Sequence, residues 1–148
     1  VSPPLRKEGD RKALIQGIKD GLIDVIVSDH KPEDEESKRL PFAQAAEGSI
    51  GIETLLSLAL ELYHNGSLPL KKIIETITCN PAKILKINKG NLKKGSDADL
   101  CIFDLDQPWK VDVSKLKSKS KNAAIENRKL QGKVLMTYLK GESVFNLQ

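Results

Sequence analysis

The chain has 148 residues, of which 39% are hydrophobic and 30% charged, and its formal net charge at neutral pH is +4. This length and composition suit one ordinary globular domain with a core of its own. No apolar run approaches the roughly 18 residues that a membrane span requires, and no signal peptide is visible, so no membrane partner is expected. The cysteines, Cys79 and Cys101, lack a CxxC spacing, which favours reduced thiols in a cytoplasmic protein.

The positive charge is concentrated in the C-terminal part of the chain. Residues 88–148 carry 12 basic and 7 acidic groups, a net of +5, whereas residues 1–87 carry 12 basic and 13 acidic groups, a net of −1. Of the 24 cations, 20 are lysine, and no series of aromatic residues lies among them. Recognition of bases and phosphates favours arginine and stacked aromatics, so we expect a solvated lysine-rich surface and no nucleic-acid partner.

The start of the chain bears on its completeness. The first residue is Val1, and the sequence contains a single methionine, Met136. Because translation starts at methionine, we expect the chain to be processed or to be part of a longer protein. If the chain is part of a longer protein, we expect it to pack against the upstream part of that same protein.

The first predicted elements are a helix and a strand. A helix is expected over residues 10–21, closed by Gly21. Its buried positions are expected to fall four apart, at Leu14, Ile18 and Leu22. A strand is expected over residues 24–28, because three β-branched residues run together there and Pro32 cannot continue a sheet. A helix followed directly by a strand is typical of an α/β fold.

The middle of the chain alternates between loops and helices. A polar loop with four consecutive acids is expected over residues 30–49, followed by a helix to His64. The buried stripe of that helix is expected at Ile52, Leu55, Leu56, Ala59 and Tyr63. Further helices are expected from Pro69 and over residues 80–85, since proline suits the first turn of a helix.

After residue 87 the pattern changes to that of strands. Strands are expected over residues 99–104 and around Trp109, and residues 133–139 and 143–145 are expected to form a hairpin. These strands are too few to close a sheet alone. We therefore expect a small β unit over residues 88–148 that completes a sheet begun upstream, lies apart from residues 1–87 and partly buries Trp109.

An acid and a histidine, Asp29 and His30, stand where the predicted strand meets its exit loop. In barrels of alternating strands and helices, catalytic residues collect at that end of the strands. Asp29 is therefore a candidate catalytic acid, with a turn-capping carboxylate as the alternative. His30 is a candidate to support the site from behind, with a structural histidine as the equal alternative. His64 lies late on a helix, and we do not expect it to be a ligand.

An ordered set of motifs resembles the C-terminal third of class I dihydroorotases in the amidohydrolase superfamily. The matches are Pro3 to Arg6, Ser28-Asp29-His30 with Pro32, Gly48, Gly51, Glu53 and Thr54, Asn80-Pro81-Ala82, Gly95 with Ala98-Asp99-Leu100, Ser118 to Asn122, and Leu130 to Val134. The resemblance implies a metal-dependent hydrolase that interconverts dihydroorotate and carbamoyl aspartate. It also implies an α/β fold, with the last strand and helices of a TIM barrel over residues 1–87 and strands of a small β-sandwich over residues 88–148.

The same resemblance implies the site residues. Asp29 corresponds to the acid at the end of the last barrel strand, which touches the zinc and carries the proton of the metal-bound water. The resemblance places one or two zinc ions in the whole protein, held mostly by upstream residues. It also implies either a homo-oligomer or a partner of the aspartate transcarbamoylase type. The residues implied to bind substrate are Ser2, Glu33, Glu47 and Gly48, and those implied to lie behind or beside them are His30 and Arg6.

The chain departs from the family pattern at two of these positions. Ser2 stands where the family has asparagine, and Glu33 stands where it has a substrate-binding histidine; a subgroup with a similar Lys38 to Ala43 loop also lacks that histidine. The metal-binding histidines and bridging lysine of the family lie upstream, and a catalytic zinc site needs about three protein ligands. We therefore expect this chain alone to be inactive.

Two other readings stay open beside a true dihydroorotase. One is a non-catalytic, dihydroorotase-like subunit with a structural role. The other is a related cyclic-amide hydrolase, such as a hydantoinase or an allantoinase.

Overall fold

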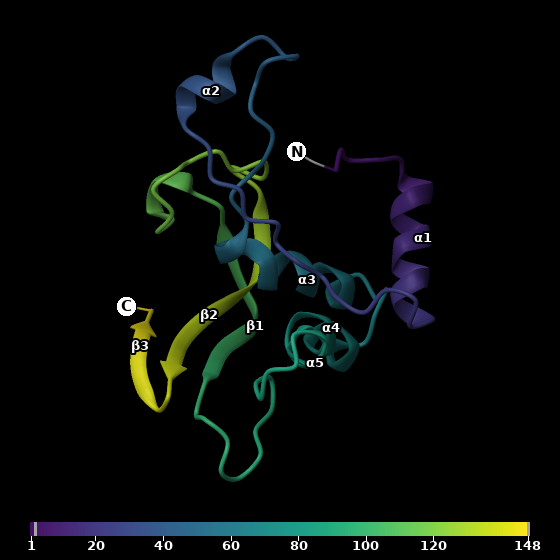
Figure 1. Cartoon of the computed structure of the whole chain (residues 1–148), viewed down its shortest axis with the longest axis vertical. Helices are drawn as coiled ribbons and strands as arrows, with labels where there is room; N and C mark the ends of the chain where they lie inside the picture. Colours follow the sequence, from purple (N-terminus) through teal and green to yellow (C-terminus); the bar gives the residue numbers. More distant parts are fainter. Residues whose placement is uncertain (2, 148) are drawn as a thin grey trace.

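The computed structural model describes residues 1 and 3–147 and divides them between a helical part and an antiparallel sheet. Figure 1 shows helices α1, α3, α4 and α5 on one side, the strands on the other, and α2 on a loop that projects from the body. No helix in this described part is long and apolar enough to cross a membrane. The elements are α1 (Glu8–Lys19), α2 (Glu35–Arg39), η1 (Ile52–Thr54), α3 (Leu55–His64), α4 (Leu70–Ile77), α5 (Cys79–Ile84), β1 (Leu100–Lys110), η2 (Val113–Lys115), β2 (Lys129–Leu139) and β3 (Glu142–Asn146).

Helix α1 is confirmed, but its buried face is not the predicted one. The helix ends at Lys19, and Gly21, the residue after its C-cap Asp20, has a φ of 75°, the left-handed conformation that glycine adopts most easily. Ile18 is buried as expected, whereas Leu14 is 58% and Leu22 80% exposed. Ile15 takes their place, because the helix is rotated so that Ile15 and Ile18 face the core.

The hydrophobic core lies between the helices. Ile73 of α4 is fully buried and forms one cluster with Ala59, Leu68 and the buried residues of α1, whereas Leu60 of α3, also fully buried, faces Gly132 of β2. The predicted stripe of α3 is wrong at Ile52 and Tyr63, which are exposed, and it missed Leu60. The start of α4 at Pro69 and the short helix α5 are confirmed.

The strand predicted over residues 24–28 does not form. Among the described residues, one backbone–backbone bond holds this segment to a neighbouring element, from the Ile26 N–H to the Thr76 carbonyl oxygen at 3.1 Å, and the Asn80 amide donates to the Asp24 carbonyl oxygen at 2.9 Å. Val27, expected to be buried, is 70% exposed. A β-branched run becomes a strand only when neighbours supply ladder hydrogen bonds, and the described residues supply none on either side.

The C-terminal part forms one three-stranded antiparallel sheet in the order β1-β2-β3. The register runs from Leu100 opposite Tyr138 to Lys110 opposite Lys129. The β2–β3 turn places both Lys140 and Gly141 at positive φ, as a tight two-residue hairpin requires. The hairpin prediction is therefore confirmed, and no second sheet packs on this one within the described residues.

The sheet is attached to the helices through Trp109, which is half-buried as predicted. Its Nε1 donates to the Gly132 carbonyl oxygen at 3.0 Å and to the Ser57 hydroxyl on α3 at 3.1 Å. The Lys133 ammonium lies 3.8 Å from the centre of the Trp109 ring, a cation–π contact.

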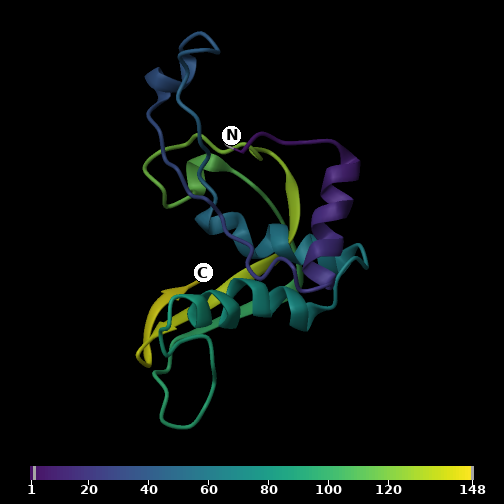
Figure 2. The ribbon, with the colours of Figure 1, turned by 45° about the vertical axis from the view of Figure 1, so that its right-hand side comes forward.

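The segment between β1 and β2 turns back toward the loops at the start of the chain, and Figure 2 shows it beneath the α2 loop. The Ile50 N–H donates to the Asn122 carbonyl oxygen at 3.3 Å, and the Ala124 N–H donates to the Ser49 hydroxyl at 2.9 Å. The expectation that the tail lies apart from the first part of the chain is wrong for this segment. The division at residues 87 and 88 stays a prediction.

Candidate functional site

Asp29 lies at the corner where residues 24–28 turn into the α2 loop. Its backbone is in the left-handed region with a φ of 43°, which aspartate and asparagine tolerate better than other L-residues. The preceding residue is held closely, because a Cβ on Gly51 would lie 2.9 Å from the Ser28 carbonyl oxygen. The carboxylate of Asp29 is exposed and makes no hydrogen bond or ion pair with any described residue.

His30 fixes the backbone beside Asp29. Its Nδ1 accepts hydrogen bonds from the N–H groups of Gly51 at 3.1 Å and Ile52 at 3.4 Å. These contacts need the lone pair of Nδ1, so the tautomer that makes them carries its hydrogen on Nε2. Residues 30 and 49 also form an isolated parallel bridge, so the two ends of the α2 loop are joined at its base.

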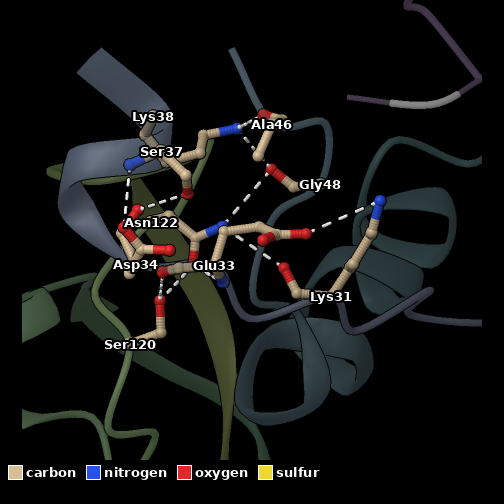
Figure 3. A network of polar contacts seen from close by, with 9 residues as sticks. All are labelled: Lys31, Glu33, Asp34, Ser37, Lys38, Ala46, Gly48, Ser120 and Asn122. Atoms are coloured by element: carbon tan, nitrogen blue, oxygen red, sulfur yellow. Dashed lines mark hydrogen bonds and ion pairs between the residues drawn. The ribbon is translucent and has the colours of Figure 1, made fainter. Parts of the chain in front are cut away.

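Glu33 and Gly48 belong to one polar network at the base of this loop, drawn in Figure 3. The Glu33 carboxylate lies 3.6 Å from the Lys31 ammonium. Gly48 is buried with a φ of 122°, and a Cβ there would lie 2.8 Å from the Lys31 stem. The Lys38 ammonium donates to the carbonyl oxygens of Ala46 at 2.7 Å and Gly48 at 3.0 Å.

The remaining predicted site residues are not drawn into this network. Arg6 and Glu47 are exposed and make no hydrogen bond or ion pair with the part of the chain that the structure describes. Ser2 lies outside the described residues. The structure therefore gathers Asp29, His30, Glu33 and Gly48 around one corner.

Two residues of this corner were missed from the sequence as site residues. Asn122 and Ser120 come from the segment between β1 and β2. Asn122 bonds to Lys31, Glu33 and Gly48, and Ser120 bonds to Glu33. They lie in the Ser118–Asn122 motif, which was noticed as a family match. No local signal connects that motif to a loop about 90 residues earlier.

The α2 loop has its own N-terminal cap. The N–H and hydroxyl of Ser37 both hydrogen-bond to Asp34, and the N–H bond to its side-chain oxygen is 2.8 Å long. The hydroxyl donates to the Asp34 backbone carbonyl oxygen, whereas the bond from the Ser37 N–H favours the charged carboxylate and holds the pKa of Asp34 below its usual value. The loop therefore starts its helix at a defined residue.

A metal centre is not complete in the described residues. No three histidine, cysteine, aspartate or glutamate side chains among them lie close enough to hold an ion together. Asp29 offers one carboxylate, whereas a catalytic zinc takes about three protein ligands. The described residues therefore do not supply the set of ligands that such a centre needs.

The sequence profile of the amidohydrolase family matches residues 2–144, and the chain belongs to that family. Its curated relatives include the dihydroorotases of Ehrlichia chaffeensis, 49% identical over 148 residues, and of Acetivibrio thermocellus, 45% identical over 145 residues. These alignments cover 100% and 97% of this chain but 33% and 34% of the relatives. The chain thus spans about a third of the length of the curated relatives it matches, and the family is generally metal-dependent.

Solved structures of the same family have the same fold. The L-hydantoinase (dihydropyrimidinase) of Arthrobacter aurescens matches with a TM-score of 0.92 and 34% identity, over 99% of this chain and 34% of that one. A D-hydantoinase matches with a TM-score of 0.90 and 28% identity, over 98% of this chain and 33% of that one. The α/β class expected from the sequence is confirmed.

Proposed function

We propose that the protein to which this chain belongs is a dihydroorotase, a cyclic-amide hydrolase that interconverts dihydroorotate and N-carbamoyl-aspartate in cytoplasmic pyrimidine synthesis. The observation that carries the proposal is 49% identity, over the whole chain, to a curated dihydroorotase. Identity to the hydantoinase structures is lower, at 22% to 34%. Residues 1–87 then form the end of a TIM barrel, and residues 88–148 form strands of a small β-sandwich.

Asp29 is the proposed catalytic residue and a zinc ligand. One or two zinc ions, held mostly by the upstream part of the protein, would supply a coordinated water whose pKa is lowered toward neutrality. Asp29 accepts a proton at a carboxylate oxygen and returns it to the leaving amide nitrogen. Its exposure and its lack of partners among the described residues support this role, because no other group competes for the carboxylate.

The proposed substrate contacts are Ser2, Glu33, Glu47 and Gly48, with Arg6 and His30 behind them. At the loop base an ion pair places the Lys31 ammonium beside the Glu33 carboxylate. Beyond the substrate, the proposed partners are the upstream part of the same protein and either a second copy or a protein of the aspartate transcarbamoylase type.

A hydantoinase is the second candidate function, because the solved structures that match this chain include hydantoinases. A non-catalytic dihydroorotase-like subunit is a third. A substrate panel on the full-length protein separates them: we expect turnover of dihydroorotate and carbamoyl aspartate and little turnover of hydantoins or allantoin. Preference for a hydantoin would replace the proposal with the second candidate, and a metal-loaded protein inactive on every substrate would replace it with the third.

Residues 1–148 expressed alone are expected to show no dihydroorotase activity and to bind a dye that reports exposed apolar surface. Activity should be absent because the described residues do not supply enough ligands for a catalytic zinc. The dye should bind because apolar side chains are exposed, among them Leu5, Leu22 and Val27. Activity and dye fluorescence, measured on material free of any longer species, check this expectation. Strong turnover by the isolated chain would contradict it.

A further inference from the structure

Asn122 is the centre of the polar network in Figure 3. Its side-chain Oδ1 accepts from the Glu33 N–H at 3.4 Å and from the Ser120 hydroxyl at 2.6 Å. Its Nδ2 donates to the carbonyl oxygens of Lys31 at 3.2 Å and Gly48 at 3.4 Å. Its backbone carbonyl accepts from the Ile50 N–H at 3.3 Å.

The partners of Asn122 require an amide. Donors face Oδ1 and carbonyl oxygens face Nδ2, so a flipped side chain would oppose its oxygen to the carbonyl oxygens of Lys31 and Gly48 and its NH2 group to the Glu33 N–H. The Glu33 N–H can only donate and so sets this orientation, and the Ser120 hydroxyl, which contacts both Oδ1 and the Glu33 carbonyl oxygen, supports it. An aspartate of the same shape would bring an oxygen, with no proton, against the carbonyls of Lys31 and Gly48.

These bonds join both ends of the α2 loop to one side chain. Lys31 and Glu33 lie on the outgoing end, two and four residues after Asp29, and Gly48 lies on the returning end. The partners are 91, 89 and 74 residues away from Asn122 along the chain. Asn122 therefore restrains the backbone that follows Asp29. Asp29 itself has a left-handed φ, a conformation that persists only where the surrounding structure holds it.

Asn122 is not what attaches its own segment to the rest of the molecule. The Glu53 carboxylate accepts from the N–H groups of Lys117 at 3.0 Å and Ser118 at 3.1 Å, and the Ser49 hydroxyl accepts from the Ala124 N–H. The segment stays fastened on both sides when the Asn122 amide is lost. The effect of losing it therefore falls on the loop base beside Asp29.

We propose that Asn122 is a positioning residue for the reaction: its amide clamps residues 31–33 to residue 48 and so holds the Asp29 corner in one arrangement. The role in turnover rests on the proposed function, whereas the clamp itself rests on the contacts alone. A geometric error of about 1 Å at a reacting group can lower a rate by about a hundredfold, so a restraint of this kind has a measurable effect on turnover.

The test compares Asn122→Asp with Asn91→Asp in the full-length protein. Asn91 is a matched control, because it is also half-buried and its Oδ1 accepts from the Lys93 N–H at 3.2 Å and the Ser96 hydroxyl at 2.7 Å. It lies in the loop between α5 and β1, at the opposite end of the molecule from α2 (Figure 1). Asn122→Ala and Asn91→Ala repeat the comparison without added charge, and Ser120→Ala tests the residue that orients the amide.

We expect Asn122→Asp to speed amide hydrogen exchange at Lys31, Glu33 and residues 48–50 by about tenfold. We also expect it to lower kcat by about ten- to a hundredfold with a smaller change in KM. Asn122→Ala should act in the same direction, Ser120→Ala more weakly, and the Asn91 variants should leave both quantities within about twofold of the parent protein.

Faster exchange with kcat unchanged would overturn the positioning role, because Asn122 would then only stabilise the loop. Exchange and kcat equal to those of the Asn91 variants would overturn the clamp as well. If the parent protein prefers another cyclic amide, only the proposed function is overturned. The kcat of Asn122→Asp is then compared with that of the parent protein on the preferred substrate, so the positioning role is still tested.

Discussion

Replacing Asp29 with asparagine in the full-length protein is expected to lower turnover by roughly two to four orders of magnitude, the usual range for a general base. Asparagine keeps the size of the side chain and removes its basic oxygen. It also tolerates the left-handed φ of 43° at this position, so the backbone is not strained by the change. A loss of turnover in Asp29→Asn can therefore be assigned to the chemistry of the carboxylate. Asp29→Ala would change the size of the side chain as well, so its effect could not be assigned in this way.

The control for Asp29→Asn is Glu33→Gln on the adjoining loop. It is expected to change mainly KM, because Glu33 is a proposed substrate contact whose carboxylate pairs with Lys31. Bound metal, measured on both variants, should fall much less than turnover, because the other ligands still hold the ion. If Asp29→Asn stays within a few-fold of the parent and Glu33→Gln abolishes turnover, the chemistry belongs to the loop and Asp29 caps a turn.

Gly132→Ala is expected to lower the free energy of unfolding by about 2 to 5 kcal/mol. The residue has a φ of 92°, which costs an L-residue about 1 to 2 kcal/mol. Its new Cβ would overlap the Cδ1 of Leu60, which is fully buried, and such overpacking costs about 1 to 3 kcal/mol. The Gly132 carbonyl also accepts from Ser57 and Trp109, so a backbone shift would break the junction of sheet and helices.

Gly95→Ala is the matched control for this prediction. Gly95 has a nearly equal φ of 88°, but a Cβ there meets no atom within 4 Å. It should therefore lose only the backbone contribution, about 1 to 2 kcal/mol. Denaturant unfolding of both full-length variants measures the difference, and equal losses would show that Leu60 yields to the added methyl group.

Local patterns predicted α1, α3, α4, α5 and the hairpin because their causes are local, whereas the loop predicted over residues 30–49 contains the short helix α2, which was not predicted. Gly21 and Asn65-Gly66 end helices, Pro69 precedes one, and the Lys140-Gly141 turn joins two strands. Each of these features depends on φ preferences or missing donors of a few adjacent residues. The same reasoning misjudged which face of α1 is buried, since the position of a helix against its neighbours is not a local property.

The sequence by itself determined the family motifs, the order of most elements and the candidate acid, Asp29, because these are properties of residue types and their spacing. The tertiary structure alone decided that residues 24–28 form no strand, since a strand needs ladder partners that these residues do not contain. It alone brought Asn122 to Lys31, Glu33 and Gly48. Contacts between residues some 90 positions apart depend on how the whole chain packs, and no short stretch of sequence records that distance.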